Sequence, residues 1–96
     1  MFARVSTLQG PPERLDEAAR MLQEEAVPFA RQQPGFKAAY WLADRSTGTV
    51  LAVSLWESEE AMRASEAAVE PRRRQSAERL GATIESVEGY EVIAHG

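Results

Sequence analysis

The segment from Phe36 to Trp56 limits the possible folds most strongly, because it predicts a β-hairpin whose two faces differ. Residues 36–44 and 49–56 are rich in apolar and aromatic residues, and the turn-forming sequence Arg-Ser-Thr-Gly separates them. A four-residue loop pairs Asp44 with Thr49 and sets the register of the two strands. A slip of one residue would mix the two faces, so the pattern supports this register.

In this register, large apolar residues and small residues separate onto opposite faces. One face carries large apolar side chains and a tyrosine, namely Phe36, Ala38, Tyr40, Leu42, Leu51, Val53 and Leu55. The other face places two tryptophans among small residues and consists of Lys37, Ala39, Trp41, Ala43, Val50, Ala52, Ser54 and Trp56. Small residues beside large aromatic residues leave concave space, so the second face predicts a pocket wall. Lys37 is expected opposite Trp56, in a cation–π contact.

A strand and a helix are predicted before the hairpin. Residues 2–8 are compatible with a short strand, and residues 15–29 carry apolar residues at helical spacing. We expect Pro28 to kink or end this helix, and Pro34-Gly35 to terminate it.

A second helix and a last strand are predicted after the hairpin. Ser58 is a good N-cap for the helix, and Pro71 is expected to interrupt it, with residues 72–80 as a second piece ending before Gly81. Residues 83–93 predict the last strand, in which we expect a bulge at Gly89.

The element order β-α-β-β-α-β predicts an α+β, ferredoxin-like fold. Right-handed connections turn this order into a four-stranded antiparallel sheet with both helices on one face. We expect residues 1–96 to form a single domain. The Tyr40 face of the sheet would then be bare and apolar, so we expect it to pack on a second copy of the chain.

Composition excludes several classes of function. The chain has no cysteine, which excludes disulfides, thiolate metal sites and a cysteine nucleophile. Its one histidine, His95, cannot form a multi-histidine metal site or a hydrolase triad near the candidate serines. A net charge of −4 disfavours nucleic-acid binding. We find no apolar run of about 20 residues and no signal peptide, so we expect a cytoplasmic protein without membrane contact.

Two motifs resemble a known family. Pro34-Gly35-Phe36 opens the second strand, and Leu55-Trp56-Glu57-Ser58-Glu59-Glu60-Ala61 closes the third strand and begins the second helix. At this spacing the chain resembles the dimeric α+β barrel superfamily, and within it the antibiotic biosynthesis monooxygenase (ABM) family. The resemblance implies a homodimer that packs sheet on sheet, with a ligand cavity between sheet and helices. It also implies either cofactor-free oxygenation of aromatic polyketides or quinols, or heme degradation.

The resemblance assigns roles to single positions. A tryptophan that ends the third strand lines the active site of the family's polyketide oxygenases, and Trp56 matches it. Ala52 stands where these enzymes have an asparagine, and Met62 where they have a tyrosine. A later helical arginine also contributes; Arg72, Arg73 and Arg74 are candidates, and we name Arg74 as catalytic with Trp56. Heme-degrading members have a histidine ligand about where Arg74 lies, and this chain has none there, so the sequence disfavours heme degradation.

The candidate substrate-binding residues are Trp41, Ser54, Ser65, Arg4 and Met62. Each also has a structural interpretation. Trp56 is equally compatible with a core tryptophan whose N–H is satisfied. Arg74 can pair with Glu70 or Glu78 on a solvated helical face. An inward-pointing Arg4 needs a carboxylate or a ligand, and the carboxylates of the last strand, Glu85, Glu88 and Glu91, are available.

The sequence favours a cofactor-independent monooxygenase that acts on a small aromatic or quinol substrate, with no metal and no cofactor. A non-catalytic dimer that binds a small ligand on the same scaffold remains the alternative, because fold alone does not separate the two. A purely structural or interaction module is a third interpretation, which a filled core without a cavity would favour.

Overall fold

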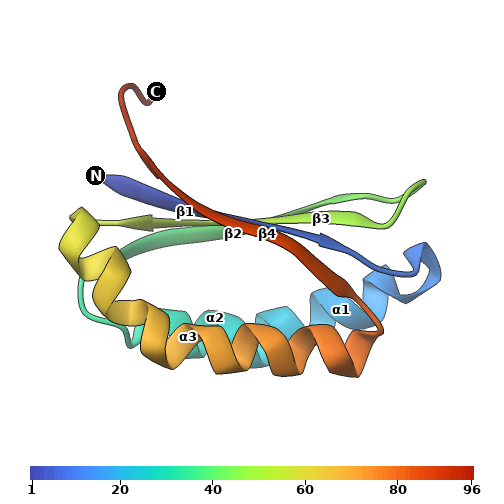
Figure 1. Ribbon diagram of the computed structural model, residues 1–96. Coiled ribbons are helices and arrows are strands. Elements are labelled where there is room, and N and C mark those ends of the chain that lie inside the picture. The colour runs from blue at the N-terminus through green and yellow to red at the C-terminus, as the bar shows by residue number, and fades with distance from the viewer.

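The computed structural model describes residues 1–96, which form one sheet covered on one side by helices (Figure 1). The elements are β1 (Phe2–Gln9), η1 (Pro12–Arg14), α1 (Leu15–Met21), η2 (Leu22–Ala26), α2 (Val27–Arg31), β2 (Phe36–Asp44), β3 (Thr49–Trp56), α3 (Glu59–Leu80) and β4 (Thr83–Glu91). The strand order is β2-β3-β1-β4, with every neighbouring pair antiparallel. The predicted ferredoxin-like α+β fold is therefore confirmed.

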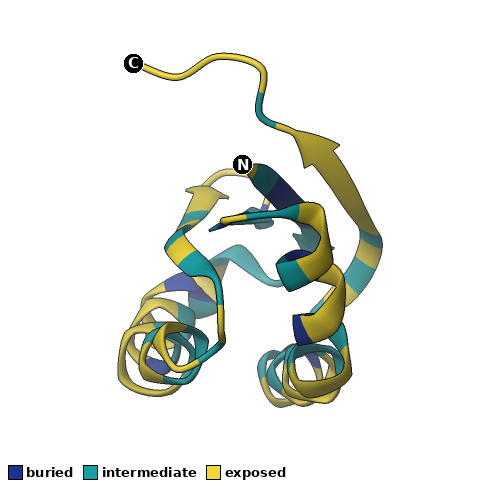
Figure 2. Ribbon diagram, turned by 90° about the vertical axis from the view of Figure 1, so that its left-hand side faces the viewer, coloured by how far each residue is buried: buried dark blue, intermediate teal, exposed yellow.

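The sheet has one covered face and one open face. The buried side chains lie along β1, at Trp56 at the end of β3 and on both helical segments, whereas the C-terminal tail is exposed (Figure 2). On the open face Tyr40, Leu42 and Tyr90 are 57%, 51% and 53% exposed. The predicted pairing of Asp44 with Thr49 is confirmed. The predicted separation of the two faces therefore holds along most of the hairpin.

The start of β2 departs from the predicted register. The pairing shifts between Phe36 and Ala38, so that Phe36 and not Lys37 lies opposite Trp56. The Phe36 ring packs edge-on against Trp56, with ring centres 5.7 Å apart. The expected Lys37 contact is therefore wrong, because a bulge absorbs that residue where the strand leaves the left-handed turn at Gly35 (φ +81°). The cation over Trp56 is instead Arg4, at 5.3 Å.

The first helical segment does not end at Pro28. It continues to Arg31, and a π-helical stretch, η2, directly precedes the proline-containing turn. Pro28 then occupies the first turn of α2, where a missing N–H disturbs the hydrogen-bond ladder least. The change in helix type thus accommodates a residue that would otherwise break an α-helix.

Helix α3 begins and ends as predicted but is continuous. The Ser58 hydroxyl accepts a hydrogen bond from the Ala61 N–H (3.1 Å), and Gly81 caps the helix with φ +67°. The interruption predicted at Pro71 is wrong, because the helix runs through it from Glu59 to Leu80. Figure 1 shows a bend between the first and second halves of α3, as expected when a proline removes one backbone hydrogen bond without ending the helix. None of the helices is long and apolar enough to cross a membrane.

Strand β4 is regular at Gly89, so the predicted bulge there is wrong. The irregularity lies further back, where neighbouring β1 residues Thr7 and Leu8 pair with Ser86 and Ile84. Gly89 has a packing role instead, since a Cβ atom there would lie 2.7 Å from the terminal methyl of Met62. The strand ends at Glu91, two residues earlier than predicted.

Candidate functional site

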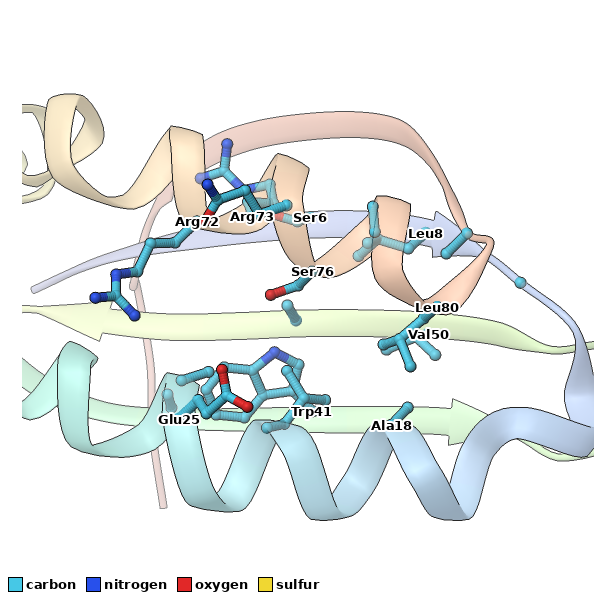
Figure 3. Close-up of a pocket in the computed structure, with 18 of the residues that line it drawn as sticks. Ser6, Leu8, Ala18, Glu25, Trp41, Val50, Arg72, Arg73, Ser76 and Leu80 are labelled. Atoms are coloured by element: carbon cyan, nitrogen blue, oxygen red, sulfur yellow. The ribbon is translucent and has the colours of Figure 1, made fainter.

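A cavity of about 190 Å³ lies between the covered face of the sheet and the helices (Figure 3). Trp41, Ala52 and Ser54 line it from the sheet, on the hairpin face predicted to be concave. Most of the remaining wall is apolar and comes from β1, β3 and both helical segments, including Leu8, Leu15, Ala18, Leu22, Phe29, Val50 and Leu80. The space exists because Ala52 carries only a methyl group between larger neighbours. Such a wall suits an apolar, ring-shaped ligand.

Trp56 forms a rigid end wall of this cavity. It is 1% exposed, and its indole Nε1–H donates to the Ser54 hydroxyl oxygen at 2.9 Å. The Phe36 ring packs edge-on against the indole, and the Arg4 guanidinium lies over it. The indole N–H is thus satisfied within the protein, and Trp56 offers a ligand only its aromatic surface.

Arg4 points inward and is held by three groups of the protein. Its Nε lies 3.2 Å from a Glu66 carboxylate oxygen, and its Nη2 donates to the Ser65 hydroxyl (2.8 Å) and to the Met62 carbonyl. Burial lowers the pKa of Arg4 and the nearby charge of Glu66 opposes that shift. The carboxylates expected as partners on β4 are not used, because α3 crosses directly over β1 and supplies Glu66. Arg4 therefore ties these two elements together.

Glu66 joins Arg4 to a second arginine. Its two carboxylate oxygens accept hydrogen bonds from both terminal nitrogens of Arg73, at 2.9 and 3.0 Å. This hydrogen bonding is the main reason that the pKa of Glu66 lies below its usual value. The three side chains form a compact ion cluster in which two positive charges share one negative charge.

Three of the predicted site residues lie outside the cavity. Ser65 is 4% exposed and donates to the Met62 carbonyl at 2.7 Å. The Met62 side chain packs against Gly89. Arg74 is exposed and pairs with Glu70 at 2.9 Å, as its structural interpretation anticipated. The structure thus brings together Trp41, Ser54, Trp56 and Arg4, and leaves these three apart.

Two serines of the cavity wall were missed from the sequence. Ser6 follows Arg4 by two positions and therefore shares its face of β1, which was an available signal. Ser76 follows Arg72 by four positions and so lies on the same face of α3. Figure 3 shows Ser76 projecting from α3 toward Trp41, which rises from β2.

Charged side chains bridge the two helical segments beside the cavity. Glu25 of η2 forms a two-point ion pair with Arg79 of α3, at 2.9 and 3.3 Å, and this contact lowers the pKa of Glu25. The Arg72 guanidinium lies 4.0 Å from the centre of the Phe29 ring, across the same gap. Both contacts link residues that line the cavity, so a ligand entering between the helices would meet them.

Comparison with known proteins gives a family match. The model of a family described as antibiotic biosynthesis monooxygenase matches residues 1–74. The uncharacterized protein Rv2557 of Mycobacterium tuberculosis (strain H37Rv) is 34% identical over 94 residues, which cover 98% of this chain and 42% of that protein. The chain thus spans less than half the length of this curated relative.

Solved structures share the fold at lower sequence identity. A candidate antibiotic biosynthesis monooxygenase from Deinococcus radiodurans is 21% identical with a TM-score of 0.77, over 99% of this chain and 95% of that one. The heme-degrader MhuD of Mycobacterium tuberculosis, solved with two hemes in its active site, is 22% identical with a TM-score of 0.76, over 100% and 99% of the two chains. At these identities the likeness concerns the fold alone.

The residues of this cavity do not fit a heme. No histidine lines it, and His95 lies beyond the end of β4 in the C-terminal tail. A cavity of about 150 Å³ holds a benzene-sized ring, so the volume of about 190 Å³ here suits one or two fused rings and not a porphyrin. No group of three or more histidine, cysteine, aspartate or glutamate side chains gathers as a metal site either.

Proposed function

The chain belongs to the antibiotic biosynthesis monooxygenase family, and from this premise we propose that it is a cofactor-independent monooxygenase for a small aromatic or quinol substrate. One observation carries the proposal, namely an apolar cavity of about 190 Å³ between sheet and helices, walled by Trp41 and Trp56. A ligand with one or two rings fits this volume, and aromatic walls favour a flat ligand.

The proposed reaction draws its electrons from the substrate. An electron-rich phenol or enol loses a proton, and its anion passes one electron to O₂. The two radicals combine to a hydroperoxide, which loses water, so that R₂CH₂ and O₂ give R₂C=O and H₂O. The protein contributes a dry enclosure with oriented donors for the developing oxyanion.

The carboxylates around the cavity are poor general bases. Glu25 and Glu66 are held in ion pairs, and the hydrogen bonds from Arg79 and Arg73 lower their pKa values. A carboxylate stabilised in its charged form has little tendency to take a proton. The substrate must therefore be acidic enough to ionise when it binds, which favours hydroxylated rings over simple hydrocarbons.

Oxygen uptake by the purified protein tests this function. We expect uptake above the buffer rate with one- or two-ring quinols such as dihydroxynaphthalenes, and loss of that uptake in Trp41→Ala. Arg74→Gln is the matched control, because Arg74 is exposed, paired with Glu70 and outside the cavity. Equal uptake by wild-type protein and Trp41→Ala would contradict a reaction in this cavity.

A non-catalytic dimer that binds a small ligand is the second candidate. The observation in its favour is the pairing of both neighbouring carboxylates, which leaves no free base at the cavity. Saturable quenching of tryptophan fluorescence by the same compounds, without oxygen uptake, would favour this candidate.

We also propose that the open face of the sheet packs on a second copy of the chain. The half-exposed side chains of Tyr40, Leu42 and Tyr90 lie on this face and support the proposal. The cytoplasmic location and the absence of nucleic-acid partners remain predictions of the sequence.

A further inference from the structure

Three hydrogen-bonding groups in the cavity wall have no protein partner. Ser6 is 3% exposed, and its hydroxyl makes no hydrogen bond to another residue. Every side-chain polar atom that is fully buried has a hydrogen-bond partner, so the Ser6 hydroxyl oxygen must be partly accessible. The small exposed part of Ser6 therefore faces the cavity that it lines. The Trp41 indole N–H and the Ser76 hydroxyl also line the cavity without a partner in the protein. All three groups are therefore open to the cavity, where either water or a polar ligand atom can complete their hydrogen bonds.

These groups surround one small residue. Ser6 of β1 and Trp41 of β2 both pair with Ala52 of the strand between them, so the three residues form one row across the covered face. Adjacent strands lie about 4.8 Å apart, which separates the backbones of Ser6 and Trp41 by about 10 Å. Ser76 projects from α3 toward this row (Figure 3). The methyl group of Ala52 leaves room for a ring edge among the three donors.

The surroundings of the cavity carry an excess of positive charge, whereas the chain as a whole has a net charge of −4. Five of the lining residues are arginines: Arg4, Arg14, Arg72, Arg73 and Arg79. Three carboxylates form ion pairs with them: Glu17 with Arg14, Glu25 with Arg79, and Glu66 with both Arg4 and Arg73. Arg72 has no carboxylate partner and rests on the Phe29 ring. The five arginines thus outnumber their ion-pair partners by two, and this excess of positive charge draws an anion toward the cavity.

We propose that the cavity binds its ligand as an aromatic oxyanion, specifically a hydroxylated aromatic carboxylate of one or two rings. The ring oxygen lies over Ala52 and receives hydrogen bonds from Ser6, Trp41 and Ser76. The carboxylate points to Arg72, one helical turn from Ser76 on the same face of α3. This inference rests on the proposed function for the use of the cavity and adds the charge and the orientation of the substrate.

The test compares two probes of the same shape, 6-hydroxy-2-naphthoate and its neutral analogue 6-hydroxy-2-naphthamide. The chain has two tryptophans and so gives two indole N–H signals in a ¹⁵N-correlated NMR spectrum, assigned with Trp41→Phe. We expect the naphthoate to shift the Trp41 signal saturably and to bind about tenfold more tightly than the amide. The Trp56 signal should move much less, because its N–H is already bound to Ser54.

Two matched variants test whether Arg72 causes the preference for the charged probe. Arg72→Gln should reduce the tenfold preference for the naphthoate to less than about twofold, because it removes the charge that attracts the carboxylate. Arg74→Gln should leave the preference intact, since Arg74 lies two residues away, is paired with Glu70 and is outside the cavity. Ser6→Ala should weaken both probes about equally, because it removes a contact to the shared ring oxygen.

Specific results overturn the inference. Equal affinity for the two probes, an equal effect of Arg72→Gln and Arg74→Gln, or no shift of the Trp41 signal by millimolar naphthoate would each do so. The proposed function fails separately, through absence of oxygen uptake with one- and two-ring quinols. A protein that oxidises a neutral quinol but does not prefer the naphthoate would retain the function and lose this inference.

Discussion

Arg4 of β1 and Glu66 of α3 are 62 positions apart in the chain, and their side chains meet at 3.2 Å while the Arg4 guanidinium lies over the Trp56 ring. The Arg4 side chain is 7% exposed and that of Glu66 41% exposed, so the pair lies at the boundary between core and solvent. Because Arg4 also binds Ser65 and the Met62 carbonyl, this contact fixes the position of α3 over the sheet.

Removing the negative charge of this pair should destabilise the fold. In Glu66→Gln, Arg4 would remain buried beside Arg73 without a compensating carboxylate, at a cost of about 2 kcal/mol in the free energy of unfolding. Glu70→Gln on the same helix is the control, because its partner Arg74 is exposed, and we expect a loss below about 0.5 kcal/mol. Urea unfolding at neutral pH measures both values, and equal losses would contradict a structural role for the Arg4–Glu66 contact.

Acidification should weaken the wild-type protein more than Glu66→Gln. The pKa of Glu66 lies below its ordinary value of 4.5 in the folded protein, chiefly because of the hydrogen bond from Arg73. A carboxylate with a lowered folded pKa stabilises the fold above its unfolded pKa, and that stability is lost as the pH falls through the folded value. The free energies of unfolding of the wild-type protein and Glu66→Gln, measured from pH 7 down to about pH 3, should therefore differ most at neutral pH and become similar in acid. Parallel curves for the two proteins would show that Glu66 does not titrate in this way.

The two tryptophans should respond differently to replacement. Trp56→Phe removes a buried hydrogen bond to Ser54 and leaves a gap in the core, so we expect a loss of about 2 kcal/mol or more. Trp41→Phe changes a cavity wall whose N–H has no protein partner, and should cost less than about 1 kcal/mol. Urea unfolding of the two variants tests whether Trp56 is a core residue. Equal losses in the free energy of unfolding would contradict that interpretation.

The hairpin could be predicted well because its signals are local. Asp44 and Thr49 flank a short loop, and the alternation of large and small residues then assigns Trp41 and Ala52 to one face. The bulge at Lys37 could not be predicted, since the alternating pattern continues through it and only the turn at Gly35 displaces the strand. A register derived from one end of a hairpin therefore becomes less reliable toward the other end.

The residues of the site were harder to predict from the sequence, because they are brought together by contacts between distant elements. No sequence pattern relates Arg4 to Glu66, so the sequence left a ligand or the carboxylates of β4 as possible partners of Arg4. Pro71 was expected to divide α3, yet packing of both halves against the sheet keeps the helix continuous. Among the arginines at 72–74, helical geometry turns Arg74 to solvent and Arg72 and Arg73 toward the cavity. Local sequence does not determine which of three adjacent side chains faces inward.

A charge on the open face should separate the proposed dimer without unfolding the chain. Leu42 is 51% exposed in the single chain, so Leu42→Glu should barely alter its intrinsic stability but should place a desolvated, unpaired carboxylate between the two sheets. Ala43→Glu, at the next residue of β2 and on the opposite face, is the control and should keep the wild-type mass. Light scattering after size-exclusion chromatography, with circular dichroism as the check on folding, measures the outcome. A wild-type protein of monomer mass, or an unchanged dimer in Leu42→Glu, would exclude this face as the interface, because no sheet-on-sheet contact could bury that charge without a partner.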